Sequence, residues 1–442
     1  MKPMPRLALT YASLTSPLSA SLLLAVGLPM LAGCGSSRTG NVGMSVGSIQ
    51  LNATAQREDE IPLTVAGGDR LRLSTSFGNV DLRLAPAGTS PILRASFTTH
   101  GRTDEEARAV LDRFSIAHTT SEGAQRYAVA GEPLTLRDGA STVSVAPQVH
   151  LVALVPAGLH AELETKSGAI LCQADCASAD LESSYGSVTA SGVRGDLRAQ
   201  TRSGSVAITD VLGRVEARTD YGRVGVERVQ GASCEIFSSS GALELASVDA
   251  ARIDAKTSYG SIEARDLRGV LEAESSSGSI TVAGLDGASA RLRSGYGNLN
   301  VEDARADLSL STASGSILAR AVQGVVAAES NYGRIEIDGV LAGLSAKSAS
   351  GAIQVQAANG SRMADEWELR SGYGRVDIAL PAGCAFELDA ETKYGAVSCD
   401  FPILVEAGYK PKSGRLQGKV GSGGPRLLLR SSSGAIEVQE VR

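Results

Sequence analysis

A chain of 442 residues is long enough for two or three globular domains, but its 50 glycines and 4% aromatic residues do not fit a packed α/β core. The composition fits a fold with many tight corners instead. The net charge of −6 is small for this length and includes no basic block, which argues against binding to nucleic acid.

Residues 1–33 have the layout of a bacterial signal peptide. Lys2 and Arg6 provide a positive start, and the apolar run over 19–32 is too short for a transmembrane helix. Leu31-Ala32-Gly33-Cys34 resembles the lipobox of bacterial lipoproteins at all four positions. The resemblance implies cleavage before Cys34, attachment of lipid to this cysteine and anchoring in a membrane. The alternative is a plain secretory signal followed by a chance cysteine.

The residues after Cys34 bear on location. Gly35 stands where an aspartate is associated with inner-membrane retention in Gram-negative lipoproteins, so we expect the outer membrane of the cell envelope. Residues 34–48 are rich in glycine and serine and are predicted to be a flexible tether that spans roughly 20 Å.

Residues 49–160 are predicted to contain a first rung of a repeat fold, at Ser76-Phe77-Gly78, and a segment that caps this rung. One helix is expected there, over 103–114. Thr103 and Glu106 have the spacing of a capping box, and apolar residues of the same stretch fall on one face. Pro156-Ala157-Gly158 then turns the chain into the repeats.

Residues 161–380 form a regular array. Each repeat contains Ser-Gly or Tyr-Gly, followed one residue later by Val, Ile or Leu. We name this glycine the phrase glycine and count positions in a repeat from it. Most phrase glycines are 18 or 19 residues apart, which is the signature of a repeat architecture. In the array they are Gly168, Gly186, Gly204, Gly222, Gly241, Gly260, Gly278, Gly297, Gly315, Gly333 and Gly351.

The positions of a repeat predict two short β-strands. Positions −7, −5, +2 and +4 are apolar and those between them are mostly polar, as in strands with one buried face. We therefore expect strands at about −7 to −3 and +2 to +6, joined by two corners. Position −3 is Ser or Thr throughout, which predicts a ladder of hydroxyls bonded to corner backbone or to each other. Glycine at +9 is expected to supply the backbone angles of the second corner.

Like positions stack in a parallel solenoid but not in an antiparallel meander, so this pattern favours the solenoid. The predicted fold class is all-β: a single-stranded, right-handed parallel β-helix with about 18 residues and two short strands per rung, and an N-terminal α/β capping segment. At about 4.8 Å per rung, fourteen or fifteen rungs would form a rod of about 65–70 Å. Residues 381–442 should contribute degenerate rungs, one of them around Gly414, and a C-terminal cap.

Position −1 alternates between serine and tyrosine, so the true unit is a pair of rungs. The simpler interpretation is corner packing, in which each large side chain covers the small one of the next rung. The alternative is an exposed aromatic stripe that stacks on glycan rings or binds a partner protein. This candidate stripe consists of Tyr185, Tyr221, Tyr259, Tyr296, Tyr332 and Tyr373, with Arg223, Arg334 and Arg375 nearby.

Cysteine and histidine positions give no catalytic or metal motif. Cys172, Cys234 and Cys399 fall on inward positions, where a small apolar residue is the simplest interpretation. In an oxidising envelope, Cys172-Cys176 and Cys384-Cys399 could form disulfides. All four histidines precede the array, so no metal site and no cofactor are expected.

The repeats resemble a bacterial family of β-strand-repeat domains of unknown function, whose members carry the label "putative adhesin". The resemblance rests on the Thr-x-x-Gly-x-Ile/Val units, on Pro-Ala-Gly before the array, and on the ending over 421–436. It covers about residues 60–442. It implies a right-handed parallel β-helix and transfers no catalytic residue.

The leading hypothesis is a lipid-anchored, non-enzymatic envelope protein that acts as a scaffold or adhesin-like interaction surface. Its partners would be the membrane, through the N-terminal lipid, and a glycan or an envelope protein. Outward acidic residues leave open a carbohydrate-active β-helix enzyme of the envelope, such as a lyase or a glycosidase. A third alternative is an envelope sensor that binds a regulatory partner through the N-terminal segment. The pattern does not indicate an oligomeric state.

Overall fold

The computed structural model describes residues 44–46, 49–121, 123–138, 141–405 and 413–441. These residues separate into two compact units: 44–57, 98–114 and 131–148 form the first, and 58–97, 115–130 and 149–441 form the second. The expected signal peptide, Cys34 and most of the expected tether lie outside the described residues. Predictions about the lipid anchor therefore stay predictions.

The first unit contains the one described helix, α1 (Asp104–Leu111). The Thr103 hydroxyl accepts a hydrogen bond from the Glu106 amide at 3.3 Å, as a capping box requires. The Glu106 carboxylate, however, accepts from the Arg102 amide at 3.1 Å. The helix ends three residues before the predicted end, and the Arg57 guanidinium donates to the exposed carbonyls of Leu111 and Phe114 at 3.0 and 2.8 Å.

Strands complete the first unit. Two antiparallel pairs belong to it: β1 (Met44–Val46) with β2 (Ile49–Leu51), and β9 (Leu134–Asp138) with β10 (Ser141–Val145). Two longer strands contribute residues to both units: β3 (Ala53–Pro62) and β6 (Ile92–Gly101).

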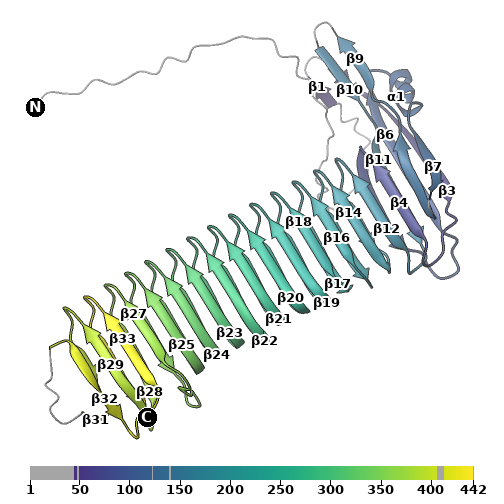
Figure 1. Ribbon diagram of the computed structural model, residues 1–442. Helices are drawn as coiled ribbons and strands as arrows, with labels where there is room; N and C mark the ends of the chain where they lie inside the picture. The colour runs from purple at the N-terminus through teal and green to yellow at the C-terminus, as the bar shows by residue number, and fades with distance from the viewer. Residues whose placement is uncertain (1–43, 47–48, 122, 139–140, 406–412, 442) are drawn as a thin grey trace, which may run out of the picture. The chain divides into compact units, whose positions relative to one another are not determined.

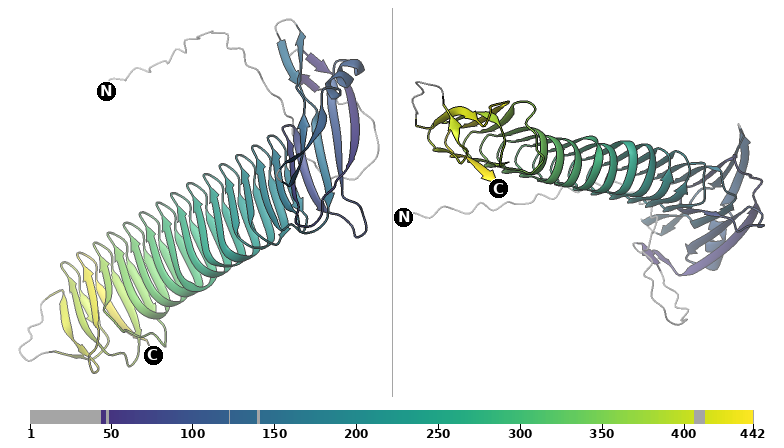
Figure 2. Two further views of the ribbon diagram at one scale, coloured as in Figure 1. Left: turned by 45° about the vertical axis from the view of Figure 1, so that its right-hand side comes forward. Right: turned by 90° about the horizontal axis from the view of Figure 1, so that it is seen from below.

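The second unit is a parallel β-solenoid, whose rungs stack side by side (Figures 1 and 2). Near its start each rung has two short strands, as predicted, and each strand pairs in parallel with its counterpart one rung away. Ile170 lies beside Val188, and Val188 beside Val206, so position +2 stacks on position +2. This register confirms the solenoid and excludes the meander. The two-strand rungs comprise β4 (Arg70–Thr75), β5 (Gly78–Leu84), β12 (His160–Thr165), β13 (Ile170–Gln173), β14 (Ser178–Ser183), β15 (Val188–Val193), β16 (Leu197–Thr201), β17 (Val206–Leu212) and β18 (Val215–Thr219).

Further along, the second strand of one rung continues through the corner into the first strand of the next. The resulting strands are 14 or 15 residues long. Their inward side chains at −7, −5, +2 and +4 are buried, as the alternation predicted. These strands are β19 (Val224–Ser238), β20 (Leu243–Thr257), β21 (Ile262–Ser275), β22 (Ile280–Ser294), β23 (Leu299–Thr312), β24 (Ile317–Ser330) and β25 (Ile335–Ser348).

The hydroxyl ladder at position −3 is present, and it bonds to corner backbone. The Ser275 hydroxyl donates to the carbonyl of Gly260 in the preceding rung at 3.0 Å and accepts from the amide of its own phrase glycine, Gly278, at 2.8 Å. Thr201, Thr219 and the other buried residues at this position repeat the arrangement. Each hydroxyl thus fixes the corner of its own rung and joins it to the neighbouring one.

The phrase glycines stack in one ladder of fifteen residues. A Cβ added to any of them after the first would lie between 1.7 and 2.3 Å from the carbonyl oxygen of the phrase glycine stacked beside it. Glycine is therefore required at this corner because two backbones approach closely. In spatial order the ladder is Gly78, Gly168, Gly186, Gly204, Gly222, Gly241, Gly260, Gly278, Gly297, Gly315, Gly333, Gly351, Gly374, Gly434 and Gly395.

The second corner agrees with the prediction only in part. Glycine at +9 has the expected positive φ at Gly269 and Gly324, 127° and 141°. At Gly195, Gly213, Gly231 and Gly287 no positive φ occurs, and glycine is required there because an added Cβ would clash with the preceding rung. The left-handed residue lies at +6, where φ is between 52° and 75°. Residues of several types occupy this column, which is why the sequence did not reveal it: Gly192, Asp210, Arg228, Ser247, Asp266, Gly284, Asp303 and Ala321.

The N-terminal edge of the solenoid is covered by two strands. β8 (Ala124–Ala130) pairs with β4, and β11 (Gln148–Val155) pairs with β5, both in parallel. β7 (Ser115–Ser121) pairs with β8 in the antiparallel sense. The first rung therefore presents no free strand edge on this side, which protects it from pairing with another chain.

At the C-terminal end the rungs are not stacked in chain order. β33 (Arg426–Ser431) lies between β27 (Trp367–Ser371) and β29 (Phe386–Thr392), and β34 (Ile436–Val441) lies between β28 (Val376–Pro381) and β30 (Val397–Cys399). The final strands of the chain thus fill a place between two rungs that precede them in sequence (Figure 1).

An antiparallel strand closes this end. β32 (Arg415–Val420) pairs with β29 and with β31 (Ile403–Leu404) in the antiparallel sense. The prediction of a degenerate rung around Gly414 is therefore wrong, because this residue has φ of 76° and leads into the capping strand. β26 (Ile353–Ala357) belongs to the last rung of the uninterrupted array.

Candidate functional site

Tyrosines at position −1 form an exposed row along one corner of the solenoid. The six predicted side chains are between 63% exposed, at Tyr185, and 72% exposed, at Tyr296 and Tyr373. Rings that covered the neighbouring serines would have lost most of their accessible surface, so these values argue against corner packing. Large exposed aromatic side chains at regular positions are characteristic of interaction surfaces.

One member of the row was missed from the sequence. Tyr394 precedes the phrase glycine Gly395 and is 84% exposed. The signal was present as Tyr394-Gly395-Ala396-Val397, but the irregular spacing of the C-terminal rungs concealed it. We define the tyrosine ridge as the row made by Tyr185, Tyr221, Tyr259, Tyr296, Tyr332, Tyr373 and Tyr394.

The alternation of the ridge follows the order of rungs in space rather than in sequence. Along the chain, Tyr373 and Tyr394 occupy consecutive phrases with no serine phrase between them. In the structure, the rung of Ser433 is inserted between their rungs, because β33 and β34 pair on both sides. At the other end Phe77 occupies position −1 of the first rung, and Ser167 follows it. Aromatic residue and serine thus alternate through all fifteen rungs of the glycine ladder.

Backbone hydrogen bonds from the amides of Tyr185, Tyr221, Tyr259 and Tyr394 hold these residues in place. The Tyr221 amide donates to the Arg202 carbonyl of the preceding rung at 3.0 Å, and the Tyr394 amide donates to the Ser432 carbonyl at 3.1 Å. Two residues before each tyrosine lies a hydroxyl of the buried ladder. The ridge is therefore carried by a rigid backbone, and little conformational entropy remains to be lost when it binds a partner.

The predicted arginines flank the ridge and are already engaged with acidic residues. The Arg223 guanidinium lies 3.1 Å from the Glu244 carboxylate, and that of Arg334 lies 3.4 Å from Glu336. Arg375 contacts Asp377 at 2.5 Å and also contacts Glu437. These arginines keep half or more of their side-chain surface exposed, so they can add hydrogen bonds at the edge of the ridge.

The middle of the ridge has small, uncharged neighbours. Positions −2 and +1 around Tyr259 are Ser258 and Ser261, and around Tyr296 they are Gly295 and Asn298. Tyrosine with serine, glycine and asparagine is the composition of antibody paratopes, where rigid aromatic area is combined with adaptable hydrogen bonding. The corner has the chemistry of a binding surface.

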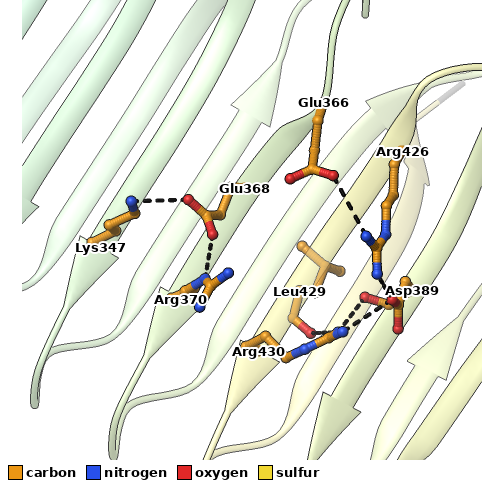
Figure 3. Close-up of polar contacts among 8 residues, drawn as sticks. All are labelled: Lys347, Glu366, Glu368, Arg370, Asp389, Arg426, Leu429 and Arg430. Carbon is orange, nitrogen blue, oxygen red and sulfur yellow. Dashed lines mark hydrogen bonds and ion pairs between the residues drawn. The ribbon is translucent and has the colours of Figure 1, made fainter.

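A cluster of charged side chains connects the C-terminal rungs (Figure 3). On β29 the Asp389 carboxylate accepts hydrogen bonds from Gln417 of β32 at 2.8 Å and from Arg430 of β33 at 2.9 Å, and Arg426 also binds it. Burial alone would raise the pKa of Asp389, but the bonds from Arg430, Arg426 and Gln417 outweigh it and hold the pKa well below its usual range. This cluster is structural, since it joins the out-of-order rung to the cap.

A neighbouring cluster continues along the same face. The Glu368 carboxylate lies 2.9 Å from the Lys347 ammonium and also contacts Arg370 (Figure 3). Burial would raise the pKa of Glu368, but the Lys347 hydrogen bond and the nearby Arg370 charge lower it. Lys347, Arg370 and Arg430 thus occupy successive rungs. The carboxylates of Glu368 and Asp389 neutralise their charge.

No disulfide joins any of the five described cysteines in the structure. The sulfurs of Cys172 and Cys176 are buried and lie 3.9 Å apart, whereas Cys384 and Cys399 are half-buried. Burial, with Glu235 and Asp254 nearby, raises the pKa of the Cys234 thiol to about 12, as expected for an inert core residue. Disulfides between Cys172 and Cys176 and between Cys384 and Cys399 in an oxidising envelope stay predictions.

Some outward carboxylates of the array form ion pairs between rungs, as in Glu272 with Arg252 and Lys256 at 3.2 and 3.8 Å. Among the described residues, no group of three or more His, Cys, Asp and Glu side chains could hold a metal ion. None of the helices in the described ranges is long and apolar enough to cross a membrane.

A groove follows the second corner of the solenoid. Its larger section has a volume of about 690 Å³ and includes the exposed side chain of Leu212. Ion pairs cross it, from Arg194 to Asp175 and from Arg228 to Asp210. Both signs of charge occur along it, so it selects neither an anionic nor a cationic ligand.

The profile of the Toastrack DUF4097 family matches residues 161–284 and 269–439. No curated protein matches the chain. Among solved structures, a "putative cell adhesion protein" from Clostridium sporogenes ATCC 15579 is similar, with 10% identity, a TM-score of 0.15 and coverage of 88% of this chain and 100% of the other. A "putative adhesin" from Bacteroides fragilis NCTC 9343 has 10% identity, a TM-score of 0.17 and coverages of 88% and 97%. A "putative lipid binding protein" from Parabacteroides distasonis ATCC 8503 has 11% identity, a TM-score of 0.18 and the same coverages.

Proposed function

This chain belongs to the Toastrack DUF4097 family, and we propose that it is a lipid-anchored, non-enzymatic protein of the bacterial cell envelope, whose solenoid presents the tyrosine ridge as an adhesin-like binding surface. The expected signal peptide and the lipobox ending in Cys34 support the anchor. Because β1 begins at Met44, the tether would comprise only residues 34–43 and would let the protein move by roughly 16–19 Å from the membrane surface.

One observation carries the proposal: seven tyrosines in a row are each at least 63% exposed on a rigid corner. An exposed tyrosine ring leaves apolar surface in contact with water, which is unfavourable. A ring buried at a contact removes roughly 150–250 Å² of surface from water and offers a hydroxyl for hydrogen bonding. Tyrosine and arginine are the residues that most often dominate binding energy at interfaces. The ridge combines both at Tyr221 with Arg223, Tyr332 with Arg334 and Tyr373 with Arg375.

The chemistry of the ridge suits an envelope glycan or an envelope protein. Aromatic faces stack on the apolar faces of sugar rings or on protein side chains, and the serine hydroxyls between them offer donors and acceptors. The mild net charge of −6 gives no reason to expect a strongly charged ligand.

Pull-down from solubilised envelopes tests the proposal. The full chain is compared with a Tyr221→Ser/Tyr259→Ser/Tyr296→Ser variant, which is expected to lose most bound envelope material. The matched control replaces three exposed apolar residues of the second corner, Leu212→Ser/Val270→Ser/Val325→Ser, and should bind as the unmodified chain does. Equal losses in both variants, or none in either, would refute a role of the ridge in binding.

The anchor needs a separate test. Cys34→Ser is expected to move the protein from the membrane fraction to the soluble fraction, and mass spectrometry of the mature N-terminal peptide should find lipid on Cys34 of the unmodified chain. An unlipidated N-terminus in the membrane fraction would contradict this part of the proposal.

A further inference from the structure

We propose that the tyrosine ridge binds the ridge of a second copy of this chain, with the tyrosines of each copy inserted between those of the other. The inference rests on the proposed function, since it takes the ridge as a binding surface and names its partner. Four features of the described residues support it: the spacing of the rings, the open positions between them, the constancy of the alternation and the available area.

The spacing leaves room for one ring between two tyrosines. Tyrosines occupy every second rung, so consecutive rings are about 9.6 Å apart, twice the strand spacing. A ring inserted midway would lie about 4.8 Å from each neighbour, within the range of roughly 4.5–7 Å at which aromatic rings pair favourably. A continuous row of tyrosines would have closed these gaps.

The positions between the rings are open. Ser203, Ser240, Ser277 and Ser314 are exposed, and each lies on the rung between two tyrosines. A serine leaves space above the corner and supplies a hydroxyl that can bond to the phenol of an incoming tyrosine. Tyr221, Tyr259 and Tyr296 therefore each have an open slot on both sides.

The ridge is complementary to itself when two copies run antiparallel. With a twofold axis between the rungs of Tyr259 and Ser277, Tyr259 faces Ser277 of the partner copy. The same axis places Tyr296 against the partner's Ser240 and Tyr221 against the partner's Ser314, because each pair is equidistant from the axis in rungs. Such an isologous contact uses the same surface twice and closes into a dimer.

The constancy of the alternation favours a rigid partner of the same period. The phase is kept at Tyr373, Ser433 and Tyr394, although these residues are out of order in the chain. A flexible polymer could bind an irregular row, and a polymer with another repeat would lose register over seven tyrosines. A second copy of the chain has the same period because it has the same sequence.

The area is sufficient for a stable dimer. With this axis six of the tyrosines, all except Tyr394, face a rung of the partner copy. If each loses on the order of 100 Å², less than the full surface of a tyrosine, two copies together bury roughly 1,200 Å². Specific interfaces bury roughly 1,200–2,000 Å². The small, uncharged neighbours of Tyr259 and Tyr296 allow close approach at the centre of the contact.

A variant with tyrosines at the open serine positions distinguishes this inference from non-specific hydrophobic association. The full chain in detergent is analysed by sedimentation velocity over a dilution series, and a reversible dimer is expected. Ser240→Tyr/Ser277→Tyr/Ser314→Tyr adds aromatic surface but closes the slots, so dimerisation should weaken by at least about thirtyfold, the effect of one strong hot spot. Tyr221→Ser/Tyr259→Ser/Tyr296→Ser should weaken it as much, and the second-corner control should not change it.

Two results would overturn self-docking: a chain that stays monomeric at every concentration, or a slot-filled variant that dimerises as well as the unmodified chain. Because all these residues lie at an exposed corner, matching melting temperatures establish that the variants are folded. The envelope pull-down distinguishes the two proposals. Envelope binding that depends on the tyrosines in a monomeric chain refutes self-docking alone. Envelope binding that is independent of them, with a tyrosine-dependent dimer in sedimentation, refutes the proposed envelope role alone.

Discussion

The side-chain carboxylate of Asp389 lies 2.9 Å from the Arg430 guanidinium, and the Asp389 backbone carbonyl accepts a second bond from Arg430 at 2.7 Å. The two residues are 41 positions apart in the chain but belong to adjacent strands. Their contact exists only because the final strands of the chain are inserted between two earlier rungs.

Asp389→Asn should therefore destabilise the C-terminal end. The change removes the charge that binds Arg426 and Arg430, and we expect a loss of roughly 1–3 kcal/mol, below the 3–5 of a fully buried pair because both arginines are partly exposed. Urea unfolding and hydrogen exchange of β29 and β33 measure the effect. Glu366→Gln, which alters a more distant partner of Arg426 at 3.7 Å, is the control and should change little.

The same contact predicts how stability depends on pH. The folded-state pKa of Asp389 is lowered, so its contribution is complete above the unfolded value of about 3.9 and declines as the pH falls from there toward the lower folded value. Exchange protection of β29 should thus fall below about pH 4 in the unmodified chain. The Asp389→Asn variant should lack this part of the pH dependence, and an identical acid profile in both would contradict the assignment.

Ser275→Ala tests the hydroxyl ladder. It leaves the Gly260 carbonyl and the Gly278 amide without their partner in a buried corner, which should destabilise the solenoid by about 1–3 kcal/mol. Ser275→Thr keeps the hydroxyl and should be nearly neutral, since threonine occupies the same position in other rungs. Thermal unfolding of the two variants decides the point, and equal melting temperatures would refute the role of the ladder.

Two glycine substitutions should behave in opposite ways. A Cβ at Gly260 would lie 1.9 Å from the Gly241 carbonyl oxygen, so Gly260→Ala must displace one rung from the next and should lower stability by more than about 3 kcal/mol. Nothing lies within 4 Å of a Cβ at Gly225, and Gly225→Ala should change stability by less than about 0.5 kcal/mol. Similar melting curves would show that close stacking does not explain the phrase glycine.

Deleting rungs tests the phase of the ridge. Removal of 260–277 joins Tyr259 to Gly278 and leaves two successive tyrosine rungs, whereas removal of 260–296 joins Tyr259 to Gly297 and keeps the alternation. Both deletions preserve the repeat and should fold, because solenoid stability depends on neighbouring rungs. Only the single-rung deletion should impair dimerisation in sedimentation. Equal association of the two would argue against register-dependent docking.

Most of the rung could be predicted from the sequence because each position has one environment in all rungs. Buried positions such as Val206 and hydroxyl positions such as Thr201 repeat at a fixed distance from the phrase glycine, so their burial and bonding were predicted correctly. The left-handed residue at +6 could not be predicted, because Asp210, Arg228 and Ala321 share a backbone conformation but no side-chain chemistry.

The spatial order of the last rungs could not be predicted at all. Residues 426–441 have the same local pattern as any other rung, and nothing in that pattern specifies which neighbours the strands choose. This order alone places Tyr394 in the alternation of the ridge. It also places Asp389 beside Arg426 and Arg430. The exposure of the tyrosines likewise depended on ring orientation, which the alternation alone left open.

The inserted rung also has a consequence for biosynthesis. Its strands, β33 and β34, are synthesised after the strands on both sides of them. Until they arrive, β27 and β29 each lack a neighbour, so a chain terminated before β33 keeps two unpaired edges that a protease can recognise. The fold thereby distinguishes chains that contain the inserted rung from chains that end before it.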